Sequence, residues 1–221
     1  MKILIHACPP RMWYVEEFLV PILCAQGAED IEIWNDTEGK GNLEACMEAF
    51  ESREGDGGTW HIQDDVLPCR DFVKRCSEFD AGVVFGFACR NFNDNVGAWG
   101  RVYTPDAWNS FQCVRIPDPL ARECAAWFRD GSWQLSPSPE LPILVKLGKG
   151  DDTMFHEFLQ DRHWDAQVVN LRPNLVEHID WLLGGSVLGI YLLLLLITIG
   201  YSLFAQLLTF LSTLYSEFRL R

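Results

Sequence analysis

Residues 59–72 read TWHIQDDVLPCRDF, and this stretch decides the fold that we expect. A short apolar run ends at two adjacent carboxylates, Asp64 and Asp65, and Pro68 then stops any regular element. A strand followed by acidic residues and a turn is typical of carboxylates held at the C-terminal edge of a sheet. Ligands of open α/β sheets bind at that edge. We therefore expect an α/β domain whose ligand site includes Asp64 and Asp65.

The two neighbouring carboxylates also indicate a kind of ligand. Their charges repel each other, and a divalent cation relieves the repulsion. Mg²⁺ prefers oxygen ligands and often takes one or two carboxylates together with substrate phosphates. A metal–diphosphate site is one interpretation of Asp64 and Asp65. A solvated turn is an equally good one for this stretch alone, because aspartates are common in turns.

Strand and helix patterns alternate along the rest of the chain. Residues 2–7 and 31–34 are predicted strands, and residues 12–25 between them have helical spacing in spite of Pro21. This βαβ pattern favours parallel strands, so the predicted fold is a mainly parallel sheet flanked by helices. Further helices are predicted at 43–50 (with Asn42 as N-cap), 71–79, 119–128 and 153–160, and further strands at 60–63, 81–88, 144–146 and 168–169. A long loop is predicted at 90–113.

The charge and the cysteines exclude some classes of protein. The net charge is −13, and residues 1–180 hold 16 of the 18 basic and 30 of the 31 acidic residues. Such an acidic surface repels a phosphate backbone, so tight nucleic-acid binding is not expected. None of the eight cysteines forms a CxxC pair. Without a signal peptide at the N-terminus, we expect reduced thiols in a cytoplasmic protein, with an exported disulfide protein as the alternative.

Four stretches in a fixed order carry a family resemblance. CPPR at residues 8–11 follows the first predicted strand, and the acidic pair comes next. GKGDDTMFHEFL at residues 148–159 is a second glycine-acidic turn before a helix, and NLRPNLVEHI at residues 170–179 contains a late histidine. Over residues 1–187 the chain resembles the inverting, metal-dependent nucleotide-sugar glycosyltransferases of the GT-A fold, and is similar to small bacteriophage enzymes of that family.

The resemblance implies a metal site of Mn²⁺ or Mg²⁺. Asp65 matches the metal-binding aspartate of the family, and His178 matches the histidine that reaches the same metal or the diphosphate. Asp64 matches the position that touches the metal through water or contacts the ribose of the donor. Gln63 stands where the family often has an acid. His61, in contrast, alternates with core residues and is interpreted as structural.

The resemblance also implies a reaction and its remaining residues. Asp152 matches the catalytic base, and Asp151 precedes it. Arg11 and Asp36 match positions near the nucleotide, and Lys40 is assigned to the diphosphate. The implied activity is transfer of a sugar from a nucleotide-sugar donor to an acceptor hydroxyl with inversion. A non-catalytic protein of the same fold that binds a sugar nucleotide or a metal, tethered to a membrane, is the alternative.

The C-terminal segment differs in character from the rest of the chain. Residues 181–216 carry no charge. A helix of ~20 residues spans the ~30 Å hydrocarbon core of a bilayer, and residues 188–208 have that length. We expect a domain at 1–180, cytoplasmic in location, and a membrane anchor within 181–221. A buried terminal helix and a tail unrelated to the family are the alternatives, and Arg219 and Arg221 argue mildly against a cytoplasmic domain.

We predict that the full-length protein partitions into membranes, whereas a chain that ends at Asp180 stays in solution. The reason is that the uncharged segment can bury its apolar side chains only in lipid or in protein. Centrifugation of a lysate at high speed, without detergent, measures the partition of both chains. Full-length protein that remains in the supernatant without aggregating would contradict the anchor.

Overall fold

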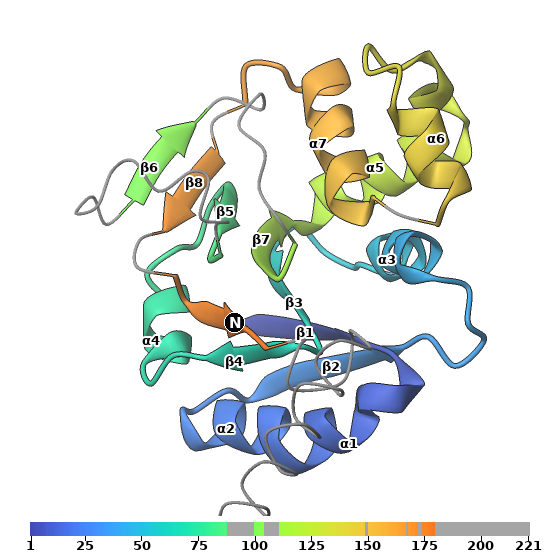
Figure 1. Cartoon of the computed structure of the whole chain (residues 1–221). Coiled ribbons are helices and arrows are strands. Elements are labelled where there is room, and N and C mark those ends of the chain that lie inside the picture. The colour runs from blue at the N-terminus through green and yellow to red at the C-terminus, as the bar shows by residue number, and fades with distance from the viewer. Residues whose placement is uncertain (88–99, 104–110, 149, 167, 172–173, 180–221) are drawn as a thin grey trace, which may run out of the picture. The chain divides into compact units, whose positions relative to one another are not determined.

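The structure is a computed structural model that describes residues 1–87, 100–103, 111–148, 150–166, 168–171 and 174–179 (Figure 1). The chain divides into two units, Met1–His178 and Ile179–Arg221, and every element described below belongs to the first. The predicted anchor at residues 188–208 lies outside the described residues. Among the residues that are described, no helix is long and apolar enough to cross a membrane.

Seven strands form one mixed, mostly parallel sheet. Their order is β2-β1-β3-β7-β5-β8-β6, and all but β6 and β7 run in the same direction. The strands are β1 (Lys2–Ala7), β2 (Asp30–Asn35), β3 (Gly58–Gln63), β5 (Val83–Phe85), β6 (Gly100–Tyr103), β7 (Cys113–Pro117) and β8 (Val168–Leu171). A second, two-stranded antiparallel sheet pairs β4 (Val66–Pro68) with β9 (Val176–His178).

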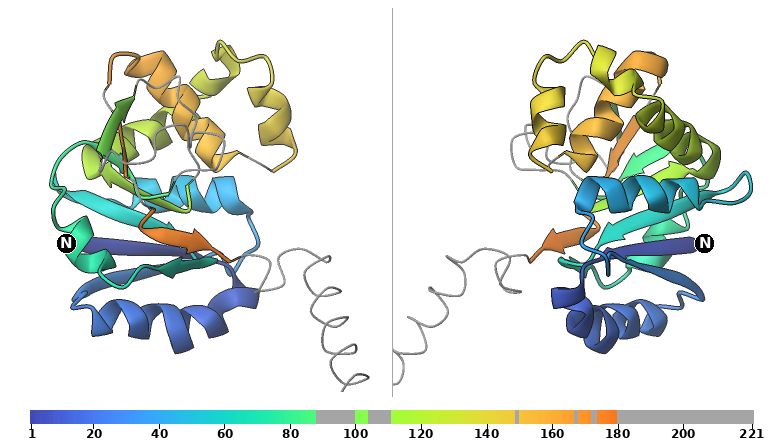
Figure 2. Two further views of the ribbon diagram at one scale, coloured as in Figure 1. Left: turned by 60° about the vertical axis from the view of Figure 1, so that its left-hand side comes forward. Right: turned by 90° about the vertical axis from the view of Figure 1, so that its right-hand side faces the viewer.

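Helices cover both faces of the sheet (Figures 1 and 2). One face carries η1 (Pro9–Arg11), α1 (Met12–Tyr14), the π-helix η2 (Val15–Leu19) and α2 (Val20–Ala25). The opposite face carries α3 (Asn42–Glu51), which packs with α5 (Asp118–Arg129) and α7 (Asp151–Arg162). The remaining helices are α4 (Phe72–Cys76), η4 (Ser132–Leu135) and α6 (Leu141–Lys146). The predicted α/β class, with a mainly parallel sheet flanked by helices, is confirmed.

The core beneath α3 is aromatic. Phe50 of α3, Phe111 and Phe155 of α7 are each at most 1% exposed, and the Phe111 and Phe155 ring centroids lie 5.2 Å apart. Phe50 also contacts the imidazole of His61 on β3, at 5.8 Å between ring centroids. These contacts hold α3 and α7 against the sheet, so the residues at their N-terminal ends have fixed positions relative to β3.

Several local predictions were wrong, and each has a physical reason. Residues 144–146 are helical, since Pro142 lies in the first turn of α6, where its missing N–H costs nothing. The two residues after the acidic pair form the short strand β4, which ends at Pro68 as predicted. Strand β6 lies inside the predicted loop at 90–113. The helix α7 already begins at Asp151, so the two aspartates belong to its first turn. The N-cap of α3 is Gly41, with φ of 92°, and not Asn42.

Candidate functional site

A cleft of about 350 Å³ opens at the C-terminal ends of β1, β2 and β3. These strands are parallel, and in register His6 pairs with Gln63 and Ala7 with Asn35, so their chains leave the sheet at one edge. The residues that line the cleft are His6, Ala7, Cys8, Arg11, Asp36, Gly41, Asn42, Gln63, Asp64 and Asp65. The structure therefore brings four of the predicted site residues together in one cleft.

Asp64 and Asp65 form a two-residue turn between β3 and β4 and are both buried. The Arg11 guanidinium lies between them, because its Nη1 donates to Asp64 Oδ1 and to Asp65 Oδ2, each at 2.8 Å. The backbone N–H of Cys8 donates to Asp64 Oδ2 at 2.7 Å. The prolines of CPPR lie in the 3₁₀ turn η1, which sets Cys8 and Arg11 opposite the acidic turn.

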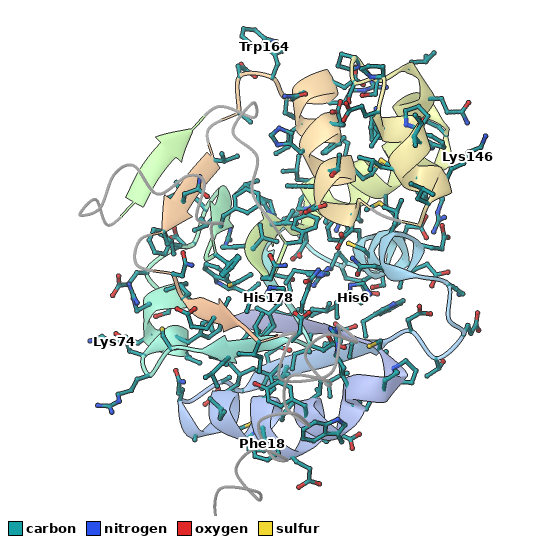
Figure 3. All side chains as sticks on the ribbon, viewed as in Figure 1. His6, Phe18, Lys74, Lys146, Trp164 and His178 are labelled. Atoms are coloured by element: carbon teal, nitrogen blue, oxygen red, sulfur yellow. The ribbon has the colours of Figure 1, made fainter. Side chains whose placement is uncertain are left out.

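His178 reaches the acidic pair from far along the chain. It pairs with Val66 in the small sheet, directly after Asp65, and its Nε2 lies 3.2 Å from Asp65 Oδ2 (Figure 3). Burial acts to raise the pKa of Asp65, but the hydrogen bond and charge of His178 and the charge of Arg11 outweigh it, so the pKa lies below its ordinary value. Asp65 Oδ1 is buried and has no hydrogen-bond partner among the described residues. Asp65 is therefore an ionised carboxylate, and one of its oxygens is buried without a hydrogen-bond partner among the described residues.

Asp36 and Lys40 have different surroundings from each other. The Asp36 carboxylate accepts the backbone N–H groups of Lys40 and Gly41, each at 2.9 Å, and so shapes the rim of the cleft. The Lys40 ammonium instead pairs with Glu48 at 2.7 Å and Glu38 at 2.9 Å. It lines a separate, smaller cleft of about 190 Å³. The structure thus does not bring Lys40 to the acidic pair, because two glutamates hold its side chain elsewhere.

Neither Asp151 nor Asp152 is among the residues that line the cleft. The buried Asp151 accepts a hydrogen bond from Gln63 Nε2 at 3.4 Å and one from the Asn42 side chain, and both of these donors line the cleft. Burial, followed by the charge of Asp152, raises the pKa of Asp151 to about 7. Asp152 is partly exposed, its Oδ1 accepts the N–H of Thr153 at 2.7 Å, and burial raises its pKa.

Two places in the described structure suit a metal ion. Asp65 and His178 offer one oxygen and one nitrogen side by side, which fits a cation that takes its other ligands from a bound molecule. The only described group of three candidate ligands whose donor atoms all lie within 4.8 Å is His6, Cys46 and His61. The sequence does not reveal this group, since its members are far apart in the chain and none of their spacings matches a known metal motif.

A scan against protein-family models finds no match for this chain, and a search of curated proteins finds none either. The fold and the cleft define a class: an α/β domain with an acidic cleft at the C-terminal edge of its parallel strands, the edge at which ligands of open α/β sheets bind.

We predict that Asp151→Asn makes the protein more resistant to unfolding at high pH. Because the pKa of Asp151 is raised in the folded state, the folded protein keeps this proton between the ordinary value of 3.8 and about 7, where the unfolded chain has lost it. Stability then falls as pH rises through this window, and asparagine removes the effect. Between pH 5 and pH 8, the free energy of unfolding of wild type should fall by about 2 to 3 kcal/mol because of Asp151. The variant should not show this loss.

Urea unfolding of both proteins at the two pH values measures this difference. Asp56→Asn, at an exposed position, is the matched control and should follow wild type at both pH values. Equal pH dependence of Asp151→Asn and wild type would show that Asp151 is ionised throughout.

Proposed function

We propose that the protein is a glycosyltransferase of the GT-A type, which moves a sugar from a nucleoside-diphosphate donor to an acceptor hydroxyl with inversion. The observation that carries the proposal is the set Arg11, Asp64, Asp65 and His178 at the C-terminal edge of the parallel strands. Three of the four stretches that carry the family resemblance supply these residues. The mixed, mostly parallel sheet with helices on both faces agrees with the same assignment.

The charge of the cleft supports a divalent cation at this site. A nucleoside diphosphate is an anion, and the carboxylates of Asp36, Asp64 and Asp65 line the cleft against a single guanidinium. Without a further positive charge, such a cleft would repel the donor. Asp65 and His178 fit a Mn²⁺ or Mg²⁺ ion that also takes diphosphate oxygens, since Asp65 Oδ1 has no other partner among the described residues. Such an ion would neutralise charge that builds on the leaving diphosphate.

The size of the cleft suits part of the donor. Its volume of about 350 Å³ lies within the range of small-molecule sites, roughly 300 to 1,000 Å³. The rim formed by Asp36 and Gly41 offers backbone and carboxylate groups at the end of β2, where we place the nucleoside. Asp64 stays hydrogen-bonded to Arg11 and Cys8 and thereby orients Asp65.

We assign the base to Asp152 rather than to Asp151. A base must reach the acceptor hydroxyl, and Asp152 is partly exposed whereas Asp151 is buried. In one displacement the hydroxyl oxygen bonds to the anomeric carbon, the bond from that carbon to the diphosphate oxygen breaks, and Asp152 takes the hydroxyl proton. Asp151, bonded to Gln63, would fix the first turn of α7 against the floor of the cleft.

We predict that Asp65→Ala abolishes Mn²⁺-dependent binding of a nucleoside diphosphate while the protein stays folded. The variant loses the carboxylate that we assign to the cation, and the donor then meets an uncompensated acidic cleft. Calorimetry with UDP and with GDP, each with and without Mn²⁺, measures the affinity, and circular dichroism checks the fold. Asp56→Ala is the control for loss of one surface charge. If Asp65→Ala binds the nucleoside diphosphate with unchanged, metal-dependent affinity, the assignment of the donor site to this cleft is wrong.

We predict that Asp152→Asn lowers the transfer rate by about 10²- to 10⁴-fold, since asparagine keeps the shape but cannot accept the proton. Donor affinity should stay nearly unchanged, because the base faces the acceptor. The measurement is metal-dependent release of nucleoside diphosphate from a panel of nucleotide sugars, with Asp151→Asn expected to lose less. A wild-type rate in Asp152→Asn would contradict the assignment. No release by the wild type with any donor would favour a sugar-nucleotide binding protein.

A further inference from the structure

Three metal-ligating side chains meet beneath the cleft. His6 comes from β1, His61 from β3 and Cys46 from α3, and one donor atom of each lies within 4.8 Å of the others. Their exposed fractions are 6% for His6 and 0% for His61 and Cys46. The group is thus enclosed, and only His6 touches the cleft.

The register of the sheet explains how the group forms. Leu4 pairs with His61 and His6 with Gln63, so both histidines point to the same face of two neighbouring strands, offset by two residues. Their ring centroids lie 5.5 Å apart. The helix α3 covers this face, and its buried side includes Cys46.

Three of the four ring nitrogens of these histidines lack a hydrogen bond within the described part of the chain. His6 Nδ1 and both ring nitrogens of His61 are buried and have no partner among the described residues. The neighbours of the His61 ring include Phe50 and Phe111, which offer no polar group. Buried polar atoms are nearly always satisfied in folded proteins, so three unsatisfied nitrogens in one place indicate an absent partner.

The electrostatics identify that partner as a cation. Burial lowers the pKa of both histidines, so each ring is neutral near pH 7 and has a lone pair to offer. Asp36 and Asp64 act on His6 and Asp152 acts on Cys46, against one guanidinium, that of Arg53. Asp151 also acts on Cys46, but it carries only part of a charge near pH 7, because its pKa is about 7. This surplus of negative charge favours a cation over a buried anion.

We propose that His6, Cys46 and His61 bind a transition-metal ion of the zinc type. Two imidazoles and a thiolate are the ligands that Zn²⁺ prefers, whereas Mg²⁺ and Mn²⁺ prefer oxygen. Around a tetrahedral Zn²⁺ the donor atoms lie roughly 3.3 to 3.8 Å apart, so small side-chain rotations would close the group. This site differs in chemistry from Asp65 and His178 and does not depend on the proposed transferase activity.

Binding has a defined proton balance. Burial raises the pKa of the Cys46 thiol well above its ordinary value, so the thiol is protonated before the ion enters. Coordination forms the Zn–S bond and releases that proton to solvent, while the neutral imidazoles bind without losing one. Since His6 lines the cleft, the fourth position of the ion would open toward it, as in zinc sites that keep one ligand exchangeable.

The test uses the full-length protein, freed of metal by a chelator and then titrated with Zn²⁺ and with Co²⁺. We expect one Zn²⁺ per chain, one proton released per ion in weak buffer, and a thiolate-to-cobalt charge-transfer band. Free Zn²⁺ at a hundredfold excess over Kd should raise Tm by about 5 to 10 °C. Cys46→Ala should lose the band and weaken binding at least about 100-fold.

Two variants make the test specific. Cys124→Ala changes an equally buried cysteine, on α5, that lies outside the group, and it should keep the band and the affinity. Asp65→Ala should also keep both, which separates this site from the donor site. Absence of the charge-transfer band in wild type would overturn the proposal and leave a buried water as the missing partner. A band of full intensity in Cys46→Ala would overturn it too, because another thiol would then be the ligand.

Discussion

The contact of the Arg11 guanidinium with both Asp64 and Asp65 is the interaction on which the cleft depends. Two adjacent carboxylates that are both buried cannot both stay ionised without a nearby positive charge. Arg11 supplies it, and so ties the turn after β3 to the segment that follows β1. Loss of Arg11 would leave two buried carboxylates uncompensated, which is destabilising. The same contact therefore holds the strand ends together and, after the larger effect of His178, helps to keep the pKa of Asp65 below its ordinary value.

The two proposed metal positions share one cleft yet differ in depth and in chemistry. Asp65 and His178 lie at the turn after β3, where the cation would take part of its ligands from a bound diphosphate. His6, Cys46 and His61 lie beneath the cleft among aromatic rings, where an ion would be held by the protein alone. One position offers an oxygen and a nitrogen and would be completed by diphosphate oxygens, whereas the other offers nitrogen and sulfur, so each would select its own ion.

The sequence predicted the parts that depend on local pattern. The βαβ start, most helices, and the position of Asp64 and Asp65 after a strand follow from periodicity and turn residues. The antiparallel position of β7 between β3 and β5 could not be predicted, because the sequence pattern of a strand does not specify which strand it pairs with. Lys40 was assigned to the diphosphate, but ion pairs with Glu38 and Glu48 decide where its side chain lies. The group of His6, Cys46 and His61 exists only through sheet register and helix packing, which no spacing along the chain reveals.

The small sheet of β4 and β9 has a consequence for the order of events during synthesis. It brings His178 to Asp65, which lines the cleft, across 113 residues of sequence. Contacts this distant in sequence form late, because the entropy of closing the loop must first be overcome. A nascent chain therefore exposes its acidic turn long before His178 has been made. The contact between His178 and Asp65 forms only after nearly all of Met1–His178 has been synthesised, so the acidic turn gains this partner in the last steps of folding.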